Sequence, residues 1–287
     1  MPVLNSIEHY LSTDGIRITL ADVSDAAREA QDIHQLQSMA AVIMGKILTA
    51  SAILAMDFKN HEGVSLKWVT GSPLGTIHSD AYEGRYVRGF PDHPECSLPD
   101  YSPDKESDFV SCSGKLFVTR YSLLKQPYVS AVNLSKGDVA ECISEYINAS
   151  DQTLSHVEIE TKLDKTGHIS RCSGFIAQLM PEGNKELFHK LFETGEKLDL
   201  WGEGDHSLTG LLRKKDYILL GKADISYRCT CSEDRIKNSL LGLPVDEQQS
   251  LLDDEKIEVV CHYCGKKYHI SRETLKKWFQ EKKGGNV

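Results

Sequence analysis

YRCTCSED (residues 227–234) and VVCHYCGKKYH (residues 259–269) hold four of the chain's eight cysteines, as one C-x-C pair and one C-x-x-C pair. Zinc prefers four tetrahedral ligands, and thiolates at about 2.3 Å suit it well. The glycine that follows the second pair is typical of a zinc knuckle, in which backbone amides turn towards the sulfurs. Residue type and spacing together predict one Zn²⁺ ion at this end of the chain. Its predicted ligands are Cys229, Cys231, Cys261 and Cys264.

Two alternative roles for these cysteines fit the sequence less well. A thioredoxin-like C-x-x-C enzyme would place Cys261 in a βαβ pattern, which the surrounding sequence lacks. The second alternative is a chance cluster of unlinked thiols. His262 and His269 could substitute as ligands, but with four cysteines present we interpret both as neighbouring or surface side chains.

The bulk composition is that of a soluble protein with more than one domain. The 287 residues are more than one core needs and are enough for two. With 33 basic and 42 acidic residues the formal net charge is −9, which argues against a nucleic-acid partner for the whole molecule. The start, MPVLNSIEHYLSTDG, lacks the basic and apolar runs of a signal peptide. We therefore expect a reducing cytoplasmic location, where paired cysteines indicate metal or redox chemistry more often than structural disulfides.

The longest apolar stretch, AAVIMGKILTASAILAM (residues 40–56), is interrupted by Lys46 and predicts a buried helix rather than a membrane span. Around it, a strand over 15–23, a helix that Ser24 caps and several short strands with turn signals follow one another irregularly. Because no regular βαβ repeat is present, the fold class predicted for residues 1–178 is α+β.

The rest of the chain divides into a connector and a small module. Residues 179–226 predict an amphipathic linker, whose short helix carries one apolar face that must dock on another surface. That face consists of Leu187, Phe188, Leu191 and Phe192. Residues 227–287 predict a zinc-binding module in which Ser232 and Ser271 cap helices.

A metal ion would supply much of the module's folding free energy. Zinc binding stabilises peptide models by about 10–16 kcal/mol, whereas whole domains are stable by only about 5–15 kcal/mol. The ion would also join Cys231 to Cys261 across 29 intervening residues, 232–260. Oxidation within each pair would give only short bridges, which remove little chain entropy and leave the two halves unconnected. Most zinc ribbons are purely structural. Because metal-bound thiolates are the form that oxidants attack, and because the ion alone would connect the two halves, the sequence favours a redox switch over a purely structural zinc site.

These residues resemble a known family. The tail ISYRCTCSEDRIKNSLLGL…VVCHYCGKKYHISRETL is similar to the 33-kDa chaperonin family, the redox-regulated heat-shock chaperones of bacteria. ILTASAILA, GSPLGTIHSDAYEGRYVRGF and QPYVSAVNLSKGDVAECISEYINASDQT resemble the family's amino-terminal domain. The resemblance covers residues 15–178 and 226–275, and it is weakest over residues 181–222.

The resemblance implies a holdase chaperone that works without ATP and is not an enzyme. In the family's reduced state four cysteines bind one zinc ion and the chaperone is idle. The resemblance assigns those roles here to the four paired cysteines, with oxidation forming the disulfides Cys229–Cys231 and Cys261–Cys264. Zinc then leaves, the tail and linker unfold, and the active form, commonly a homodimer, binds unfolding client proteins and prevents their aggregation.

The client surface is expected in the connector. We expect its apolar helix face to dock on the amino-terminal domain while zinc is bound and to become exposed when zinc leaves, since contiguous apolar surface is what a misfolded client would bind. The alternative is that these side chains belong to a permanent core. No membrane partner is expected.

The main rival function is a zinc-ribbon protein that binds nucleic acid. Basic side chains are frequent near the carboxyl end and aromatic residues alternate with them, as a phosphate-binding and stacking surface requires. The basic residues are Lys266, Lys267, Arg272, Lys276, Lys277, Lys282 and Lys283, and the aromatic ones are Tyr263, Tyr268 and Trp278. Acidic residues nearby offset this charge and favour a plain solvated helix face. A third class, a thiol oxidoreductase, would turn over a disulfide substrate with a single cysteine pair.

The other four cysteines lie outside the two motifs. We interpret Cys112, Cys142 and Cys172 as buried small apolar side chains, and Cys96, which lies in a polar loop, as the most exposed of the four.

Overall fold

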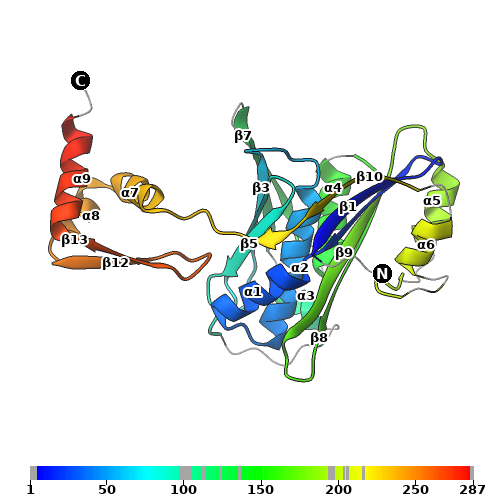
Figure 1. Ribbon diagram of the computed structural model, residues 1–287, viewed down its shortest axis with the longest axis horizontal. Coiled ribbons are helices and arrows are strands. Elements are labelled where there is room, and N and C mark those ends of the chain that lie inside the picture. The colour runs from blue at the N-terminus through cyan, green and yellow to red at the C-terminus, as the bar shows by residue number, and fades with distance from the viewer. Residues whose placement is uncertain are drawn as a thin grey trace. The chain divides into compact units, whose positions relative to one another are not determined.

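The computed structural model divides the chain into two compact units, Met1–Arg228 and Cys229–Val287 (Figure 1). The residues that it describes are 5–96, 102, 105–110, 114–122, 125–134, 137–150, 152–192, 198–202, 204, 207–214 and 217–284. The sequence-based division into three parts, with a separate linker over 179–226, stays a prediction.

The larger unit contains two antiparallel sheets, apart from one short parallel pair at an edge. Within the described residues, the first sheet has five strands in the order β10-β1-β2-β9-β8 and the second has six in the order β11-β5-β4-β3-β6-β7. The first comprises β1 (Ser6–Leu11), β2 (Ile16–Asp22), β8 (Ser155–Leu163), β9 (Ile169–Leu179) and β10 (Ile218–Asp224). The second comprises β3 (Gly63–Val69), β4 (Thr76–Tyr82), β5 (Tyr86–Pro91), β6 (Lys115–Ser122), β7 (Lys125–Asn133) and β11 (Ser226–Tyr227). In the residues that the structure describes, strands and helices are mixed without βαβ repeats, so the α+β prediction is confirmed.

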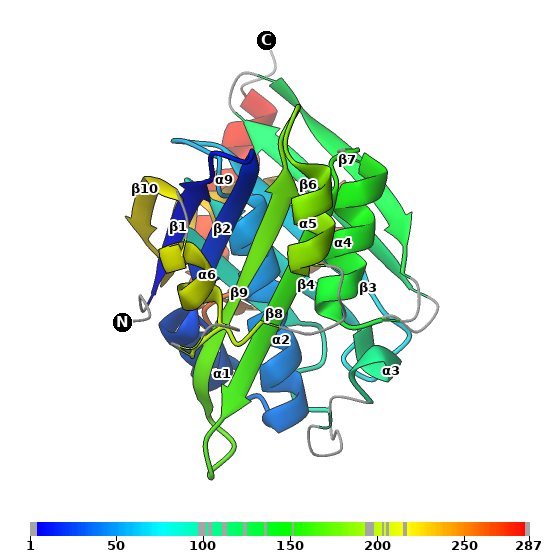
Figure 2. The ribbon, with the colours of Figure 1, turned by 90° about the vertical axis from the view of Figure 1, so that its right-hand side faces the viewer.

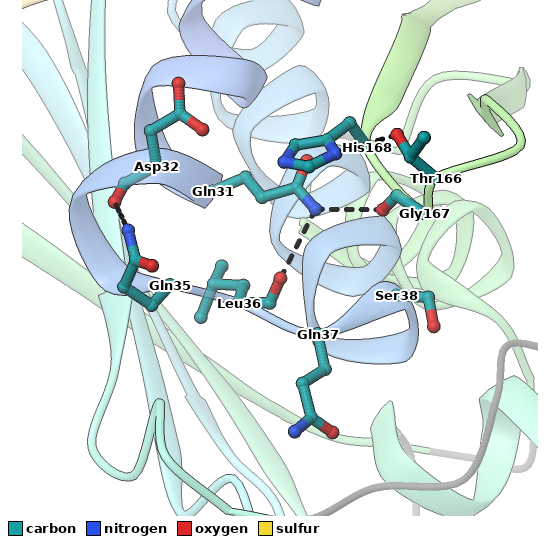
Figure 3. Close-up of a pocket in the computed structure, with 9 residues that line it drawn as sticks. All are labelled: Gln31, Asp32, Gln35, Leu36, Gln37, Ser38, Thr166, Gly167 and His168. Carbon is teal, nitrogen blue, oxygen red and sulfur yellow. Dashed lines mark hydrogen bonds between the residues drawn. The ribbon is translucent and has the colours of Figure 1, made fainter.

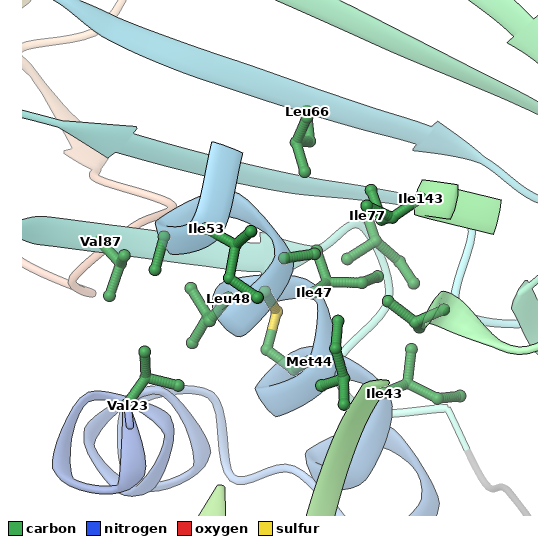
Figure 4. Close-up of a cluster of buried hydrophobic side chains, with 14 of the residues drawn as sticks. Val23, Ile43, Met44, Ile47, Leu48, Ile53, Leu66, Ile77, Val87 and Ile143 are labelled. Atoms are coloured by element: carbon green, nitrogen blue, oxygen red, sulfur yellow. The ribbon is translucent and has the colours of Figure 1, made fainter. Parts of the chain in front are cut away.

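The apolar stretch found in the sequence forms the helix α2 (Ser38–Leu54), which lies in the core between the two sheets. Every residue from 39 to 53 is buried, which explains why the helix is apolar on all sides. Figure 4 shows Ile47 and Leu48 among side chains of the second sheet, and the same cluster includes residues of the first. The prediction of a buried helix is therefore confirmed. In the described part of the chain, no helix is long and apolar enough to cross a membrane.

The helix α1 (Ser24–His34) begins where the sequence predicts, but Ser24 does not cap it. The capping residue is Val23, whose own side chain makes no capping hydrogen bond. The N–H groups of Ser24 and Asp25 donate instead to Oδ1 of Asp22 at 3.1 Å and Oδ1 of Asn5 at 2.7 Å. The Ser24 hydroxyl instead accepts the backbone N–H of Cys172 in β9 at 2.9 Å. The capping prediction was wrong because a neighbouring strand, which the local sequence does not reveal, offers this hydroxyl a partner.

Lys46, the charge inside the apolar stretch, is buried and paired. Its Nζ lies 2.6 Å from Oε2 of Glu106 in α3 (Glu106–Val110), and both side chains are less than a tenth exposed. The other oxygen of Glu106 accepts the backbone N–H of Val139, at the start of α4 (Val139–Ser150), at 3.3 Å. The Glu106 carboxylate thus connects α3 and α4 to the central helix α2, through one ion pair and one hydrogen bond.

The connector packs on the outer face of the first sheet, opposite α2. Its helices α5 (Lys185–Phe192) and α6 (Leu208–Lys214) lie over this face in Figure 2. The strand β10 follows them and pairs antiparallel with β1, a strand more than two hundred residues earlier. The sequence did not reveal β10. Its residues Ile218, Leu219 and Leu220 remain 49–63% exposed.

The smaller unit has a modest core of its own. It contains α7 (Glu233–Leu241), α8 (Val245–Ser250), α9 (Arg272–Gly284) and the hairpin of β12 (Lys256–Val260) and β13 (Lys267–Ser271). Its buried cluster is Ile236, Ile257, Ile270, Leu275, Trp278 and Phe279. The Ser232 hydroxyl accepts the N–H of Arg235 at 3.2 Å, and that of Ser271 accepts the N–H of Thr274 at 3.3 Å, so both predicted caps are confirmed.

Candidate metal and redox centre

The fold brings the two cysteine pairs together. Cys229 and Cys231 lie between β11 and α7, and Cys261 and Cys264 lie in the turn of the β12–β13 hairpin. The four sulfurs all lie within 4.8 Å of one another, and this potential metal-binding group includes no histidine. His269 points elsewhere, with its Nδ1 3.7 Å from a carboxylate oxygen on β12.

The sulfur spacing fits a tetrahedral zinc ion. The Sγ atoms of Cys229 and Cys261 are 3.6 Å apart, and those of Cys231 and Cys264 are 3.5 Å apart. A tetrahedron with Zn–S distances of about 2.3 Å has edges of about 3.8 Å, whereas a disulfide bond measures about 2.05 Å. Each of these two contacts joins one pair to the other. An ion held by the four thiolates would therefore connect the two ends of the 232–260 segment.

The turn around the second pair shows why a glycine follows it. The N–H of Cys261 donates to the carbonyl of Lys266 at 2.9 Å, and the N–H of Gly265 donates to the carbonyl of Cys261 at 2.8 Å. Gly265 has φ of 68°, in the left-handed region. A side chain is disfavoured there by about 1–2 kcal/mol, so glycine allows the hairpin to close with both sulfurs on one side.

Tyr268, which the sequence suggested only as a stacking residue of the nucleic-acid alternative, is part of the cysteine site. It lies on β13, and its hydroxyl donates to Sγ of Cys231 at 3.2 Å. The N–H of Cys231 itself donates to Sγ of Cys229 at 3.4 Å. Burial opposes ionisation of Cys231, but hydrogen bonds from Tyr268 and the neighbouring thiols outweigh it and lower the pKa of Cys231 to about 7. Burial raises the pKa of Cys229 and of Cys264. The available sequence signal was a tyrosine shortly after the second cysteine pair. Its contact with Cys231 follows only from the register of the β12–β13 hairpin.

The predicted connector face is docked. Phe188 is fully buried and Phe192 is 6% exposed, while Leu187 and Leu191 are partly buried in the same cluster. The sheet side of this cluster includes Phe175, whose ring centroid lies 6.1 Å from that of Phe192. The structure thus places the four side chains on the amino-terminal sheet. Their release, and their contact with clients, stay predictions.

Two of the remaining cysteines are more deeply buried than the four of the centre. Cys142 and Cys172 are buried as predicted, and burial raises their pKa values to about 12 and about 11. Cys96 is half-buried against the core, and burial, followed by the charge of Glu95, raises its pKa. Cys112 lies outside the described residues. The three described thiols are therefore poorly ionised at neutral pH, in contrast to Cys231.

A polar pocket between α1, α2 and the β8–β9 turn has a structural role (Figure 3). The Gln31 side chain crosses it and donates to the carbonyls of Gly167 at 3.0 Å and Leu36 at 3.2 Å. Its oxygen accepts the N–H of Ile169 at 2.9 Å. These bonds tie the hairpin to the helices, and none of the pocket's residues belongs to the cysteine group.

Comparison with known proteins identifies the family. The family model described as "Hsp33 protein" matches residues 5–271. The chain belongs to the Hsp33 family. Its members include the 33 kDa chaperonin of Caldanaerobacter subterraneus subsp. tengcongensis, which is 30% identical over 280 residues covering 93% of this chain and 95% of that protein. The 33 kDa chaperonin of Thermoanaerobacter sp. is also 30% identical, in an alignment that covers 88% of this chain and 90% of that protein.

The Hsp33 fold is also found in a solved structure. The 33 kDa chaperonin of Thermotoga maritima superposes with a TM-score of 0.80 over 98% of this chain and 100% of that chain, at 23% identity. At this identity the likeness establishes the fold. Membership of the Hsp33 family supports a chaperone function for this chain. The four-cysteine group could hold a metal ion, as the zinc prediction requires.

Proposed function

We propose that this protein is a redox-regulated, ATP-independent holdase that is inactive while Cys229, Cys231, Cys261 and Cys264 bind one Zn²⁺ ion. The observation that carries the proposal is the grouping of four sulfurs, from two pairs far apart in sequence, at the spacing of a zinc tetrahedron. When bound, the ion keeps the four thiols deprotonated and connects the two pairs. The small core of the Cys229–Val287 unit gives it little other stability.

Activation consists of two oxidations within the pairs, Cys229–Cys231 and Cys261–Cys264. In each pair one thiolate attacks a peroxide oxygen and becomes a sulfenic acid, releasing hydroxide that takes up a proton. The second thiolate attacks this sulfur, the S–S bond forms, and hydroxide leaves and takes up a second proton to become water. Each pair loses two electrons and one hydrogen peroxide becomes two waters. Neither bridge spans the 232–260 segment, so the unit loses its long-range connection.

The unfolding then spreads to the connector. Only residues 225–228 separate β10 from Cys229, and the N–H of Ile225 donates to the carbonyl of Asn5 beside β1. Loss of order at Cys229 weakens this anchoring, and the α5 face of Leu187, Phe188, Leu191 and Phe192 becomes available to unfolding clients. We further propose that the active form is a homodimer and that the protein works in the cytoplasm, where its thiols stay reduced until stress.

The nucleic-acid alternative has less support from the side chains. Trp278 is only 7% exposed within the core of the smaller unit, so it is not available for stacking on bases. Lys267, one of the basic residues of that surface, lies 3.0 Å from a Glu258 oxygen. This pair reduces the positive charge that a phosphate-binding surface requires.

The test combines zinc release with an aggregation assay. Reduced, zinc-loaded protein is treated with hydrogen peroxide at raised temperature, zinc is followed with a chromogenic chelator, and light scattering of a heat-denatured client is recorded. We expect suppression of scattering to rise as zinc is released, and hydrogen exchange to accelerate over residues 185–192. Suppression by the reduced, zinc-loaded form alone would overturn the proposal. Salt-sensitive RNA binding that requires zinc would favour the alternative.

A further inference from the structure

The connector contacts the first sheet through two chemically different parts. One part is the apolar cluster already described, in which Leu200 is 4% exposed. The other lies beside it, at Asp199 and Trp201. Lys162 places its Nζ 4.1 Å from the centroid of the Trp201 ring, and the guanidinium carbon of Arg171 lies 5.6 Å from the same centroid. Two cations on neighbouring strands, here named the cation clamp, therefore hold one aromatic ring.

The carboxylate of Asp199 belongs to the same arrangement. It accepts the N–H of Trp201 and that of Gly202, both at 2.9 Å, which fixes it beside the ring. The hydrogen bond from the Trp201 N–H, then that from Gly202 and the charges of Lys162 and Arg171, outweigh burial and lower the pKa of Asp199. The connector thus presents an acidic, an aliphatic and an aromatic side chain in succession, and the sheet offers a complementary cationic and apolar surface.

The cation clamp is incompletely satisfied by the connector. Within the described residues, Nε and Nη2 of Arg171 are buried without a hydrogen-bond partner, and the nearest carboxylate oxygen, on Asp22, is 4.0 Å from Nε. Trp201 Nε1 is likewise buried without a partner. Because a guanidinium can donate to a carboxylate through two parallel bonds, a ligand with a better-placed carboxylate would gain contacts that Asp199 does not make.

We propose that Lys162 and Arg171, with the adjoining apolar face, form a subsite for client segments in which a tryptophan or tyrosine stands near a carboxylate. The connector segment 199–201 occupies this subsite in the resting state as an internal imitation of a client. This inference rests on the proposed function, because the subsite becomes free only when the connector leaves. Cations over aromatic faces are attractive, most strongly for tryptophan, so the clamp selects among exposed apolar segments rather than binding all of them equally.

A peptide that copies the connector tests the inference. Fluorescein-labelled Leu-Asp-Leu-Trp-Gly, the sequence of residues 198–202, is titrated with oxidised, zinc-free, full-length protein, and binding is measured by fluorescence anisotropy. Two matched peptides carry the equivalents of Asp199→Asn or Trp201→Leu. We expect saturable binding of the parent peptide and about tenfold weaker binding of each altered peptide, in the range that cation–π and charged hydrogen bonds support.

Variants of the clamp distinguish specific binding at Lys162 and Arg171 from nonspecific hydrophobic binding. The double variant Lys162→Gln/Arg171→Gln should bind the parent peptide about tenfold more weakly, and Lys162→Arg should retain binding because it keeps a cation. Lys67→Gln, an exposed lysine of β3 in the other sheet, is the control and should bind as wild type does. Circular dichroism of each reduced variant checks that it folds. The reduced wild-type protein should bind the peptide at least tenfold more weakly, since its clamp is occupied.

The outcomes distinguish this inference from the proposed function. Equal affinity of wild type and the double variant, or of the parent and altered peptides, would overturn the inference, as would equal binding to reduced and oxidised protein. If the same oxidised preparation still suppresses client aggregation, the proposed function survives that result. If the oxidised wild type neither suppresses aggregation nor binds the peptide, both fall.

Discussion

Phe188→Ala should release the connector without any oxidation. Phe188 is fully buried, and its ring centroid lies 5.0 Å from that of Phe192 in the cluster that joins α5 to the sheet. Truncating a fully buried phenylalanine costs about 3–5 kcal/mol. The helix α5 has only eight residues, and isolated helices of that length are marginal in water, so the docked contact sustains it. The loss therefore falls on connector docking and not on the core around α2.

The free energy that favours the docked connector is small compared with this loss. The covered face contains buried polar atoms without partners among the described residues, including Nε and Nη2 of Arg171 and Oε2 of Glu158. Each unsatisfied buried group costs about 1–3 kcal/mol. At about 1.4 kcal/mol per factor of ten, losing 3–5 kcal/mol raises the released fraction by roughly two to four orders of magnitude.

Hydrogen exchange measured by mass spectrometry on the reduced, zinc-loaded variant provides the assay. We expect faster exchange over residues 185–192, partial suppression of client aggregation and an unchanged zinc content. Leu66→Ala is the matched control, because Leu66 is fully buried in the other cluster and its truncation costs about 2–5 kcal/mol without touching the connector. If Phe188→Ala lowers overall stability as the control does, yet leaves α5 protected and the reduced protein inactive, the reasoning is refuted.

The remaining predictions concern the metal centre and the central helix. Cys261→Ser should abolish zinc binding and remove hydrogen-exchange protection throughout residues 229–284, while the larger unit apart from the connector stays folded; a variant that keeps protection over 229–284 would contradict the role of the ion. Gly265→Ala, at φ of 68°, should lose about 1–2 kcal/mol and bind zinc about tenfold more weakly in chelator competition, whereas Gly242→Ala, at φ of −77°, should not. Lys46→Met leaves the Glu106 carboxylate buried without its cation, and we expect the free energy of unfolding in urea to fall by about 3–5 kcal/mol. Adding Glu106→Leu should restore part of that stability. A double variant no more stable than Lys46→Met would exclude the ion pair as the cause.

The candidate centre was largely predictable because its signal is local. The four cysteines stand in two short motifs whose residue types suit one ion, and Gly265 follows from the turn that such a motif needs. The helix caps of the smaller unit were predictable for the same reason. Tyr268 was not, because its contact with Cys231 depends on the register of the β12–β13 hairpin and on the meeting of two segments more than thirty residues apart.

The connector shows the opposite case. Its apolar helix face was readable from the spacing of Phe188 and Phe192, but the sequence did not show what that face covers or that β10 extends the first sheet beside β1. Nor did it indicate the cation clamp, since Lys162 and Arg171 lie on different strands and Trp201 approaches them from a third segment. No local pattern specifies such partners.

The sequence alone therefore determined which thiols can share an ion, which helix must be buried and where the chain turns, because these depend on the chemistry and conformational limits of neighbouring residues. Only the tertiary structure decided that the connector lies on one sheet face, with an apolar part that fits well and a charged part that fits poorly. Contacts between distant segments determine this docking, and their free energy depends on strand order and register rather than on any residue's immediate neighbours in the sequence.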